Sequence, residues 1–232
     1  MNRKISILIS VIITGLLISS CQKDTSPVIT QTFELEIFNG LELSMAGNVR
    51  IIEGVNQKVE ITGPEETVLE IIKTVESGIW NISLPNYYNK SYDELNIVIT
   101  SNEIEHLVIS GSGNISGDYT LPLSSVAISG SGNINVKTET TRLNSEISGS
   151  GNITISGNAD TLEHFVSGSG NFNGFTLETT DTKITITGSG NSEVFVTNSL
   201  DVEISGSGNV YYKGRPSITT DISGSGQLID AN

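Results

Sequence analysis

Cysteine is almost absent from this chain of 232 residues, since Cys21 is the only one. A single cysteine excludes disulfide bonds within the chain and metal sites built from several thiolates. Basic residues are also scarce, with 12 lysines and arginines against 26 aspartates and glutamates. Phosphate binding needs a basic surface, so a net charge of −14 argues against nucleic acid as a partner.

Histidine is also rare, and the two present, His106 and His164, have no cysteine or serine partner at the spacing of a catalytic motif. The sequence has no His-Glu-x-x-His zinc motif, no Gly-x-Ser-x-Gly nucleophile motif after a strand and no phosphate-binding loop. We therefore expect no cofactor and no catalytic residues. A polysaccharide lyase or hydrolase stays open as an alternative.

The one long apolar run lies at the N-terminus. Two basic residues precede an apolar and small-residue run that reaches Ile18, which is the pattern of a secretory signal peptide. A membrane-spanning helix would need roughly 20 apolar residues, more than this run supplies. The run ends in Ile-Ser-Ser-Cys, which resembles a bacterial lipobox. We predict a lipoprotein signal at 1–20 and a lipidated Cys21, which begins a tether over 21–31.

A lipidated Cys21 would hold the protein at a membrane without a spanning helix, because each buried methylene contributes about 0.8 kcal/mol. The next residues, Gln22-Lys23-Asp24, resemble a short export signal in one lineage of Gram-negative bacteria. That signal sends lipoproteins to the outer face of the outer membrane. We therefore expect a lipid-anchored protein of the cell envelope, with the outer membrane as a partner and the domain exposed at the cell surface.

A Ser-Gly-Ser-Gly-Asn phrase organises the rest of the chain. Its first copy begins at Ser110, and the phrase recurs with small changes until the chain ends. The first glycines of the copies fall at 111, 130, 149, 168, 188, 206 and 224. A period of 18–20 residues is typical of stacked coils, whereas each blade of a β-propeller needs about 40 residues.

Apolar and polar residues alternate through every copy, as in strands with one buried face. The two glycines of each copy fall at the same alternate positions as the apolar residues, so they should face the core. The position two before the first glycine holds Ile109, Ile128, Ile147, Val166, Ile186, Ile204 and Ile222. The position four after it holds Ile115, Ile134, Ile153, Phe172, Ser192, Val210 and Leu228. Such columns form when equivalent residues stack about 4.8 Å apart, and glycines between them either bend the chain or let backbones approach closely.

These patterns predict an all-β fold, a single-stranded parallel β-helix that is right-handed because parallel crossovers almost always are. About seven regular coils occupy 106–232, and imperfect coils in 32–105 complete one domain over 32–232. Within the irregular part, Pro64 and the acidic residues after it begin a helix of about three turns, which Ser77-Gly78 ends.

The repeated Gly-Ser-Gly-Asn-Ile phrases, after an N-terminal segment of this layout, resemble the auto-transporter adhesin head domain of the GIN type. The resemblance covers roughly residues 33–230. It implies a β-helix related in shape to pectin lyases, a role in adhesion and no catalytic residues.

Two outward columns of the phrase are candidate ligand-facing rows. Regular hydroxyl and amide rows could bind a repeating glycan, another cell-surface ligand or ordered water, or could stabilise the stack by hydrogen bonding. The columns consist of Ser112, Ser131, Ser150, Ser169, Ser189 and Ser207, and of Asn114, Asn133, Asn152, Asn171, Asn191 and Asn209.

Two carboxylates are weak candidates for a cation site. Glu203 and Asp221 each lie three residues before a first glycine, so adjacent coils should place them side by side, where they repel unless a cation or water intervenes. Lys213 or Arg215 would be the basic partner of a lyase at this place. The sequence thus favours a non-enzymatic adhesion or scaffolding protein, with a glycan-acting enzyme and a passive glycan- or cation-binding module as alternatives.

Overall fold

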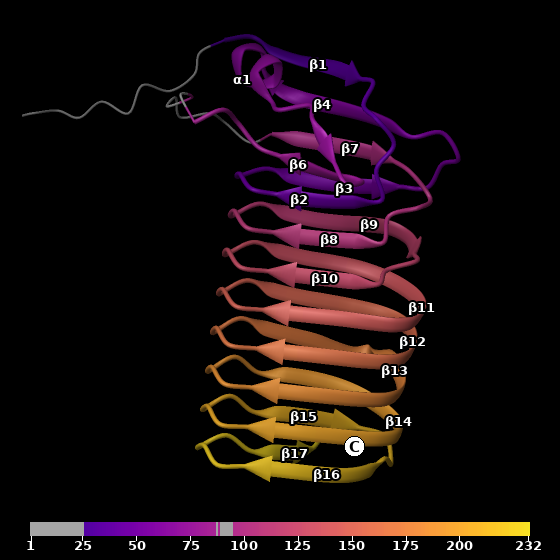
Figure 1. Cartoon of the computed structure of the whole chain (residues 1–232), viewed down its shortest axis with the longest axis vertical. Helices are drawn as coiled ribbons and strands as arrows, with labels where there is room; N and C mark the ends of the chain where they lie inside the picture. The colour runs from indigo at the N-terminus through magenta and orange to yellow at the C-terminus, as the bar shows by residue number, and fades with distance from the viewer. Residues whose placement is uncertain (1–25, 87, 89–94) are drawn as a thin grey trace, which may run out of the picture.

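The computed structural model describes residues 26–86, 88 and 95–232. The predicted signal peptide and Cys21 therefore lie outside the described residues. Parallel strands stack into one long solenoid, with the N-terminal segment at one end and the C-terminus at the other (Figure 1). In the described ranges no helix is long and apolar enough to cross a membrane.

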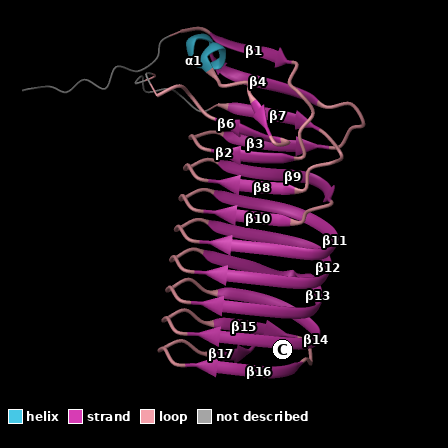
Figure 2. Cartoon of the chain, in the orientation of Figure 1, coloured by secondary structure: helices cyan, strands magenta, loops and turns pink. Residues whose placement is uncertain are grey.

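Each regular coil turns at a Gly-Ser-Gly tripeptide, which we call the glycine corner. One strand runs into the corner and a second strand leaves it, and each pairs in parallel with its equivalent in the next coil (Figure 2). The strands are β8 (His106–Ile109), β9 (Asn114–Leu121), β10 (Ser125–Ile128), β11 (Asn133–Ile147), β12 (Asn152–Val166), β13 (Asn171–Ile186), β14 (Ser192–Ile204), β15 (Val210–Lys213), β16 (Ser217–Ile222) and β17 (Leu228–Asp230). This arrangement confirms the predicted all-β, single-stranded parallel β-helix of about seven regular coils.

The long strands β11 to β14 leave one corner, bend around the opposite side and run into the next corner. The coil therefore has two outer faces. We call the pre-corner face the outward side chains of β8, β10 and β16, together with residues 142–147, 161–166, 181–186 and 199–204. The post-corner face carries the outward side chains of the strands that leave the corners.

The N-terminal coils do not stack in chain order. β2 (Gly40–Leu43) and β3 (Asn48–Ile52) pair in parallel with β8 and β9. Their other side pairs in parallel with β6 (Ile79–Ile82) and β7 (Asn96–Thr100), which follow them in the sequence. The coil formed by β6 and β7 comes second in the chain but lies farther from the regular coils than the coil formed by β2 and β3.

An antiparallel layer closes this end of the solenoid. β4 (Lys58–Pro64) pairs antiparallel with β7, and β1 (Val28–Phe33) pairs antiparallel with β4. A short helix, α1 (Glu65–Glu70), and β5 (Val75–Glu76), which pairs with β6, complete the layer. Together these elements form the cap, residues 26–105, which covers a sheet edge that could otherwise pair with another chain.

The predicted helix of about three turns is wrong in length, because α1 has only 6 residues. The chain becomes extended at Ile71, with φ −55° and ψ 133°. The N–H of Ile72 donates to the carbonyl of Ser83 at 2.9 Å, and Trp80 Nε1 donates to the carbonyl of Ile72 at 3.0 Å. Contacts with the neighbouring strand therefore replace the second half of the helix that the apolar spacing favours.

The predicted tether is also too long. It was expected to reach residue 31, but β1 begins at Val28 and continues through Phe33. Thr30 and Thr62 form a hydrogen bond of 2.8 Å between their hydroxyls across the β1–β4 pair. Polar composition alone suggested a linker, whereas pairing with β4 makes this segment a strand.

The predicted core columns lie inside the solenoid. All members of the column two before the first glycine are buried except Ile222, which is 40% exposed in the last coil. The other column is buried through Val210, including Ser192, and Leu228 is half-buried. In the cap, the rings of Phe38 and Trp80 are buried with centroids 5.6 Å apart. The alternation in the sequence therefore gives the correct inward and outward parity.

Glycine is required at the corners because the backbones of successive coils approach closely there, and not because the corner residues need a positive φ. A Cβ on Gly170 would lie 1.9 Å from the carbonyl oxygen of Gly151, and one on Gly151 would lie 1.9 Å from that of Gly132. The glycines with positive φ in the described ranges are Gly78, Gly157 and Gly214, all outside the corners. Each corner thus packs directly on the backbone of the corner before it.

We expect Gly170→Ala to lower the free energy of unfolding by about 1–3 kcal/mol, because the methyl group must displace the backbone of the preceding coil. Ser169→Ala, its exposed neighbour, should change stability by less than about 0.5 kcal/mol. Urea denaturation followed by circular dichroism measures both. Equal effects of the two substitutions would contradict the close-approach account.

Candidate functional site

The asparagine column forms a hydrogen-bonded ladder along the stack. Asn133 Nδ2 donates to Asn114 Oδ1 at 2.9 Å, and Asn152 Nδ2 donates to Asn133 Oδ1 at 2.9 Å. The ladder begins at Asn48 in the cap and continues through Asn171, Asn191 and Asn209, with distances of 2.9–3.2 Å for these bonds. Each amide therefore uses its oxygen and one N–H for stacking.

The serine column projects into solvent beside this ladder. Ser112, Ser131, Ser150, Ser169, Ser189 and Ser207 are all exposed. The asparagines are exposed at Asn114 and Asn133 and half-buried from Asn152 onward. The outward placement of both columns is as predicted, and the amide hydrogen bonds give the asparagines a structural role whether or not a ligand binds.

Glu203 and Asp221 lie side by side on adjacent coils, as their spacing predicts. Both side chains are exposed on the pre-corner face. Lys213 lies elsewhere, in β15 after the corner, where its Nζ sits 4.4 Å from the centroid of the Phe175 ring. Lys213 is therefore not brought to the pair, and Arg215, the other candidate, lies between β15 and β16. Among the described residues no group of three His, Cys, Asp or Glu side chains could hold a metal ion.

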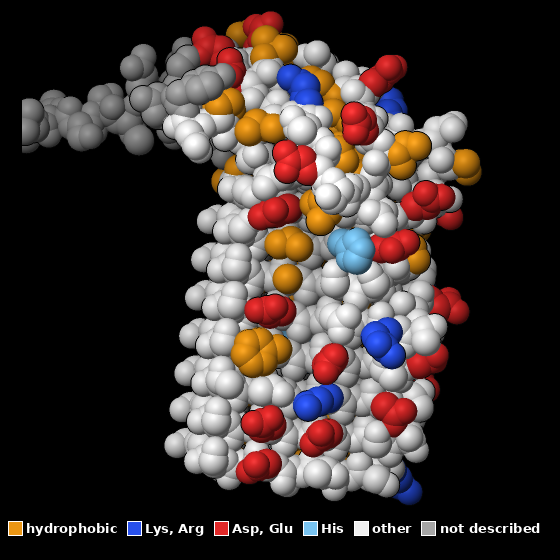
Figure 3. Space-filling view, in the orientation of Figure 1, with side chains coloured by type: hydrophobic (Ala, Val, Ile, Leu, Met, Phe, Trp, Pro, Cys, Tyr) orange, Lys and Arg blue, Asp and Glu red, His pale blue; other side chains and the backbone are white. Residues whose placement is uncertain are grey.

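The pre-corner face contains two adjoining hollows. The first, of about 380 Å³, lies over β10 and the pre-corner parts of β11 to β13. The second, of about 290 Å³, extends toward the bend and β14. Glu163 and Lys183 line both. Figure 3 looks onto this face, where acidic and basic side chains gather over the middle coils.

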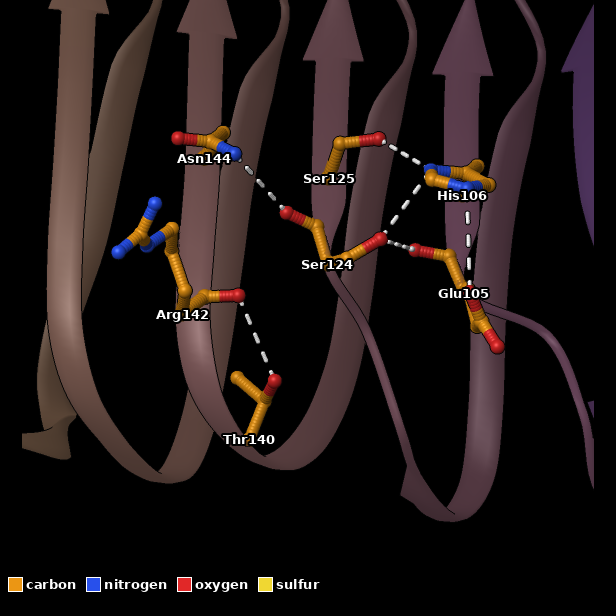
Figure 4. Close-up of polar contacts among 7 residues, drawn as sticks. All are labelled: Glu105, His106, Ser124, Ser125, Thr140, Arg142 and Asn144. Carbon is orange, nitrogen blue, oxygen red and sulfur yellow. Dashed lines mark hydrogen bonds and ion pairs between the residues drawn. The ribbon is translucent and has the colours of Figure 1, made fainter.

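Near one end of the first hollow, a histidine contacts two serines (Figure 4). His106 Nδ1 lies 2.7 Å from Ser125 Oγ and 3.3 Å from Ser124 Oγ, and His106 Nε2 lies 3.9 Å from a carboxylate oxygen of Glu105. The sequence holds no serine at the spacing of a catalytic motif from His106, so motif spacing does not predict this contact. The partner comes from the next coil, since both residues lie five before a first glycine.

This Glu105–His106–Ser125 arrangement contains the residue types of a hydrolase triad without an evident oxyanion hole. The backbone N–H groups of Ser124 and Ser125 both donate to the carbonyl of Glu105, at 2.8 and 3.1 Å. Acyl transfer depends on N–H donors aimed at the developing oxyanion. In a parallel sheet those donors are used between strands, so the contact can order the surface but offers poor stabilisation of a tetrahedral intermediate.

His164 is buried under the same face. Its ring lies 4.3 Å, between centroids, from that of Phe172, and its nitrogens have no hydrogen-bond partner of normal geometry in the described structure. Burial lowers the pKa of His164 to about 3, against a smaller opposing effect of the Ser145 backbone. The side chain is therefore neutral at physiological pH and inaccessible to solvent, as its inward parity indicates.

Burial of His164 makes folding stability depend on pH. An unfolded histidine binds a proton near pH 6.5, whereas the folded protein does not do so until about pH 3. Stability should therefore fall as the pH drops from about 6.5 toward 3, by up to about 1.4 kcal/mol per pH unit. Denaturant unfolding at several pH values should show a shallower loss for His164→Leu than for the unmodified chain. His106→Asn is the control, and a slope unchanged by His164→Leu would refute the assignment.

The described geometry can be compared with known proteins. Solved structures of similar fold include a protein named a putative adhesin from Bacteroides fragilis, with a TM-score of 0.83 and 22% sequence identity, covering 90% of this chain and 99% of the other. A protein named a putative adhesin from Parabacteroides merdae has a TM-score of 0.74 and 18% identity, covering 91% and 99%. A protein named a putative lipid binding protein from Parabacteroides distasonis has a TM-score of 0.75 and 21% identity, covering 91% and 99%.

These identities are low, so the likeness establishes the fold alone. No protein with curated annotation matches the chain significantly. One family model, described as "Putative auto-transporter adhesin, head GIN domain", matches residues 37–216, which is well over half of the sequence. Both the repeat and the β-helix agree with this match, and the chain belongs to the family of auto-transporter adhesin head GIN domains.

Proposed function

We propose that this chain is a non-enzymatic surface adhesin, anchored to the outer membrane by a lipid on Cys21, with its cap toward the membrane. The observation that carries the proposal is the position of β1, which begins the described chain at the cap end of the solenoid (Figure 1). The regular coils would then project away from the membrane and present their faces to the surroundings.

The tether is short enough to set this orientation. The carbonyl of Pro27 accepts the N–H of Glu65 at 2.9 Å, and Ser26 Oγ accepts the N–H of Glu66 at 3.4 Å, so the chain is already fixed to α1 at Ser26. Five extended residues from Cys21 to Ser26 reach at most about 18 Å. A lipid on Cys21 would therefore keep the cap close to the membrane surface.

The surface of the cap is consistent with this placement. Most of the large hydrophobic residues that the described structure exposes belong to the cap, namely Val28, Ile37, Val55, Leu69 and Ile79. Such side chains are better placed near a membrane interface than in open solvent. The family description and the adhesin names of two similar structures also favour adhesion over catalysis.

Cys21→Ala should abolish lipid attachment and move the protein from the membrane fraction to the soluble fraction. Metabolic labelling with palmitate and fractionation of cells measure both effects. Ser20→Ala, which keeps a small residue beside the cysteine, is the control and should remain labelled. Membrane retention of Cys21→Ala would contradict the lipid anchor.

Adhesion is tested on intact cells. Protease added outside should digest the displayed domain, and cells that carry it should attach to a glycan-coated or host-cell surface more than cells that lack it. An undigested domain would place it on the inner side of the membrane. Equal attachment by both kinds of cell would count against adhesion itself.

A hydrolase is the second candidate, because of the contact between His106 and Ser125 at 2.7 Å. A fluorophosphonate reagent labels serines that a neighbouring histidine activates. We expect no labelling, because the nearby N–H donors are already used within the sheet. Labelling that Ser125→Ala and His106→Asn both abolish would favour the hydrolase over the non-enzymatic adhesin.

A further inference from the structure

Phe165 is unusual on the pre-corner face. It has outward parity and is 38% exposed, whereas the other exposed large hydrophobic side chains of the described structure lie in the cap or in the last coil. Its neighbours along the same column are Glu146 and Thr185. An aromatic ring at such a position offers an apolar surface that is framed by polar groups.

The two hollows make one elongated depression around this ring. Phe165, Glu146 and Thr185 line the first, and Arg142, Asp181 and Asp201 line the second. Glu163 and Lys183 join them. Volumes of about 380 and 290 Å³ are in the range of ligand sites. The depression crosses several coils, so it suits a chain of several units better than a single small molecule.

Four charged side chains that line the depression have no partner among the described residues, whereas Asp181, which also lines it, accepts hydrogen bonds from Asn198 and Ser199. Glu146, Glu163, Lys183 and Asp201 make no hydrogen bond or ion pair in the described structure, although Glu163, Lys183 and Asp201 occupy one column on successive coils. The contrast is Arg50 on the cap, whose Nε donates to Asp118 at 2.7 Å. The carboxylates can accept, and Lys183 can donate, hydrogen bonds to a bound ligand.

The charges and the aromatic ring of the depression favour some classes of ligand over others. Carboxylates outnumber basic groups in the depression, so phosphates and acidic sugars would be repelled. A neutral sugar offers many hydroxyl groups to the carboxylates and Lys183, and its apolar ring face can lie on Phe165. Strands hold these side chains on a rigid scaffold, which limits the entropy lost on binding.

We infer that this depression is a binding groove for neutral oligosaccharides, with Phe165 stacking on one sugar ring and Glu146, Glu163 and Lys183 hydrogen-bonding to its hydroxyl groups. The inference rests on the proposed adhesive function and assigns its ligand class and its contact surface. The serine and asparagine columns at the glycine corner are outside the groove, and the asparagines stabilise the stack through their amides.

The test is binding of the full-length, detergent-solubilised protein to an array of neutral and acidic oligosaccharides of three to six units. Calorimetric titration with the best neutral ligand then measures affinity. Phe165→Ala should weaken binding at least about tenfold, because it removes the stacking surface. Phe165→Trp should retain binding, since it keeps an aromatic ring.

A matched pair of lysines tests the position of the groove. Lys183→Ala should weaken binding, whereas Lys137→Ala, an exposed lysine on the post-corner face, should leave it unchanged. The Phe165 and lysine variants should unfold at the same denaturant concentration as the parent, since each of these side chains is exposed. Ser150→Ala and Asn152→Ala at the corner should not alter affinity beyond any change in stability.

Binding of neutral ligands that Phe165→Ala and Lys183→Ala reduce would support the groove. Absence of binding to every neutral oligosaccharide, binding of acidic ones only, or binding equally reduced by Lys137→Ala would overturn it. Cell attachment distinguishes the two proposals. If cells attach normally with Phe165→Ala, the groove is refuted and adhesion stands, and if no attachment is seen with the parent chain, adhesion itself fails.

Discussion

The structure depends on direct backbone contact between successive glycine corners. Ser150 N–H donates to the carbonyl of Gly130 at 3.0 Å, and Ser169 N–H donates to that of Gly149 at 3.0 Å. No side chain fits between these backbones, so the corner fixes where each coil begins relative to the previous one. Because side chains of a strand alternate in direction, a fixed corner also decides which residues point inward.

Because the corners must pack on one another, the columns of residues at the corner are nearly uniform, whereas columns farther from it vary. At the corner, the outward columns are almost uniform serine and asparagine, and the asparagines use their amides to bond one another. Five residues before the corner, every coil differs. That column holds His106, Ser125, Asn144, Glu163, Lys183, Asp201 and Thr219. The uniform asparagine column stabilises the stack, whereas the irregular pre-corner columns produce an elongated depression that combines an exposed aromatic ring with unpartnered charges.

The sequence predicts the regular part of the fold well, because its glycine spacing and apolar alternation are both local patterns. It predicts the cap poorly. There, β6 and β7 stack outside β2 and β3, and the apolar residues after Glu70 pack against a strand instead of continuing a helix. These outcomes depend on long-range pairing, which no local period encodes.

Part of the proposed groove follows from the columns of the repeat. His106 and Ser125 share a position in the repeat, so their contact follows from the 19-residue period, although no catalytic motif has that spacing. The alternation of the repeat places Phe165 among the outward residues, which is unusual for an aromatic side chain and marks it as exposed from the sequence alone. Whether its neighbours form ion pairs or remain free depends on side-chain geometry, and only the structure shows it.

The central claim is that the corner fixes the register while the opposite bend tolerates variation. It is tested most directly by inserting one alanine at each place and measuring thermal unfolding. An insertion after Gly170 should reverse the parity of the following strand, bury polar groups and unfold the domain or lower its midpoint by many degrees. An insertion after Thr180, in the bend where coil length already varies, should be tolerated with a small change. Equal loss of stability for both insertions would contradict the account.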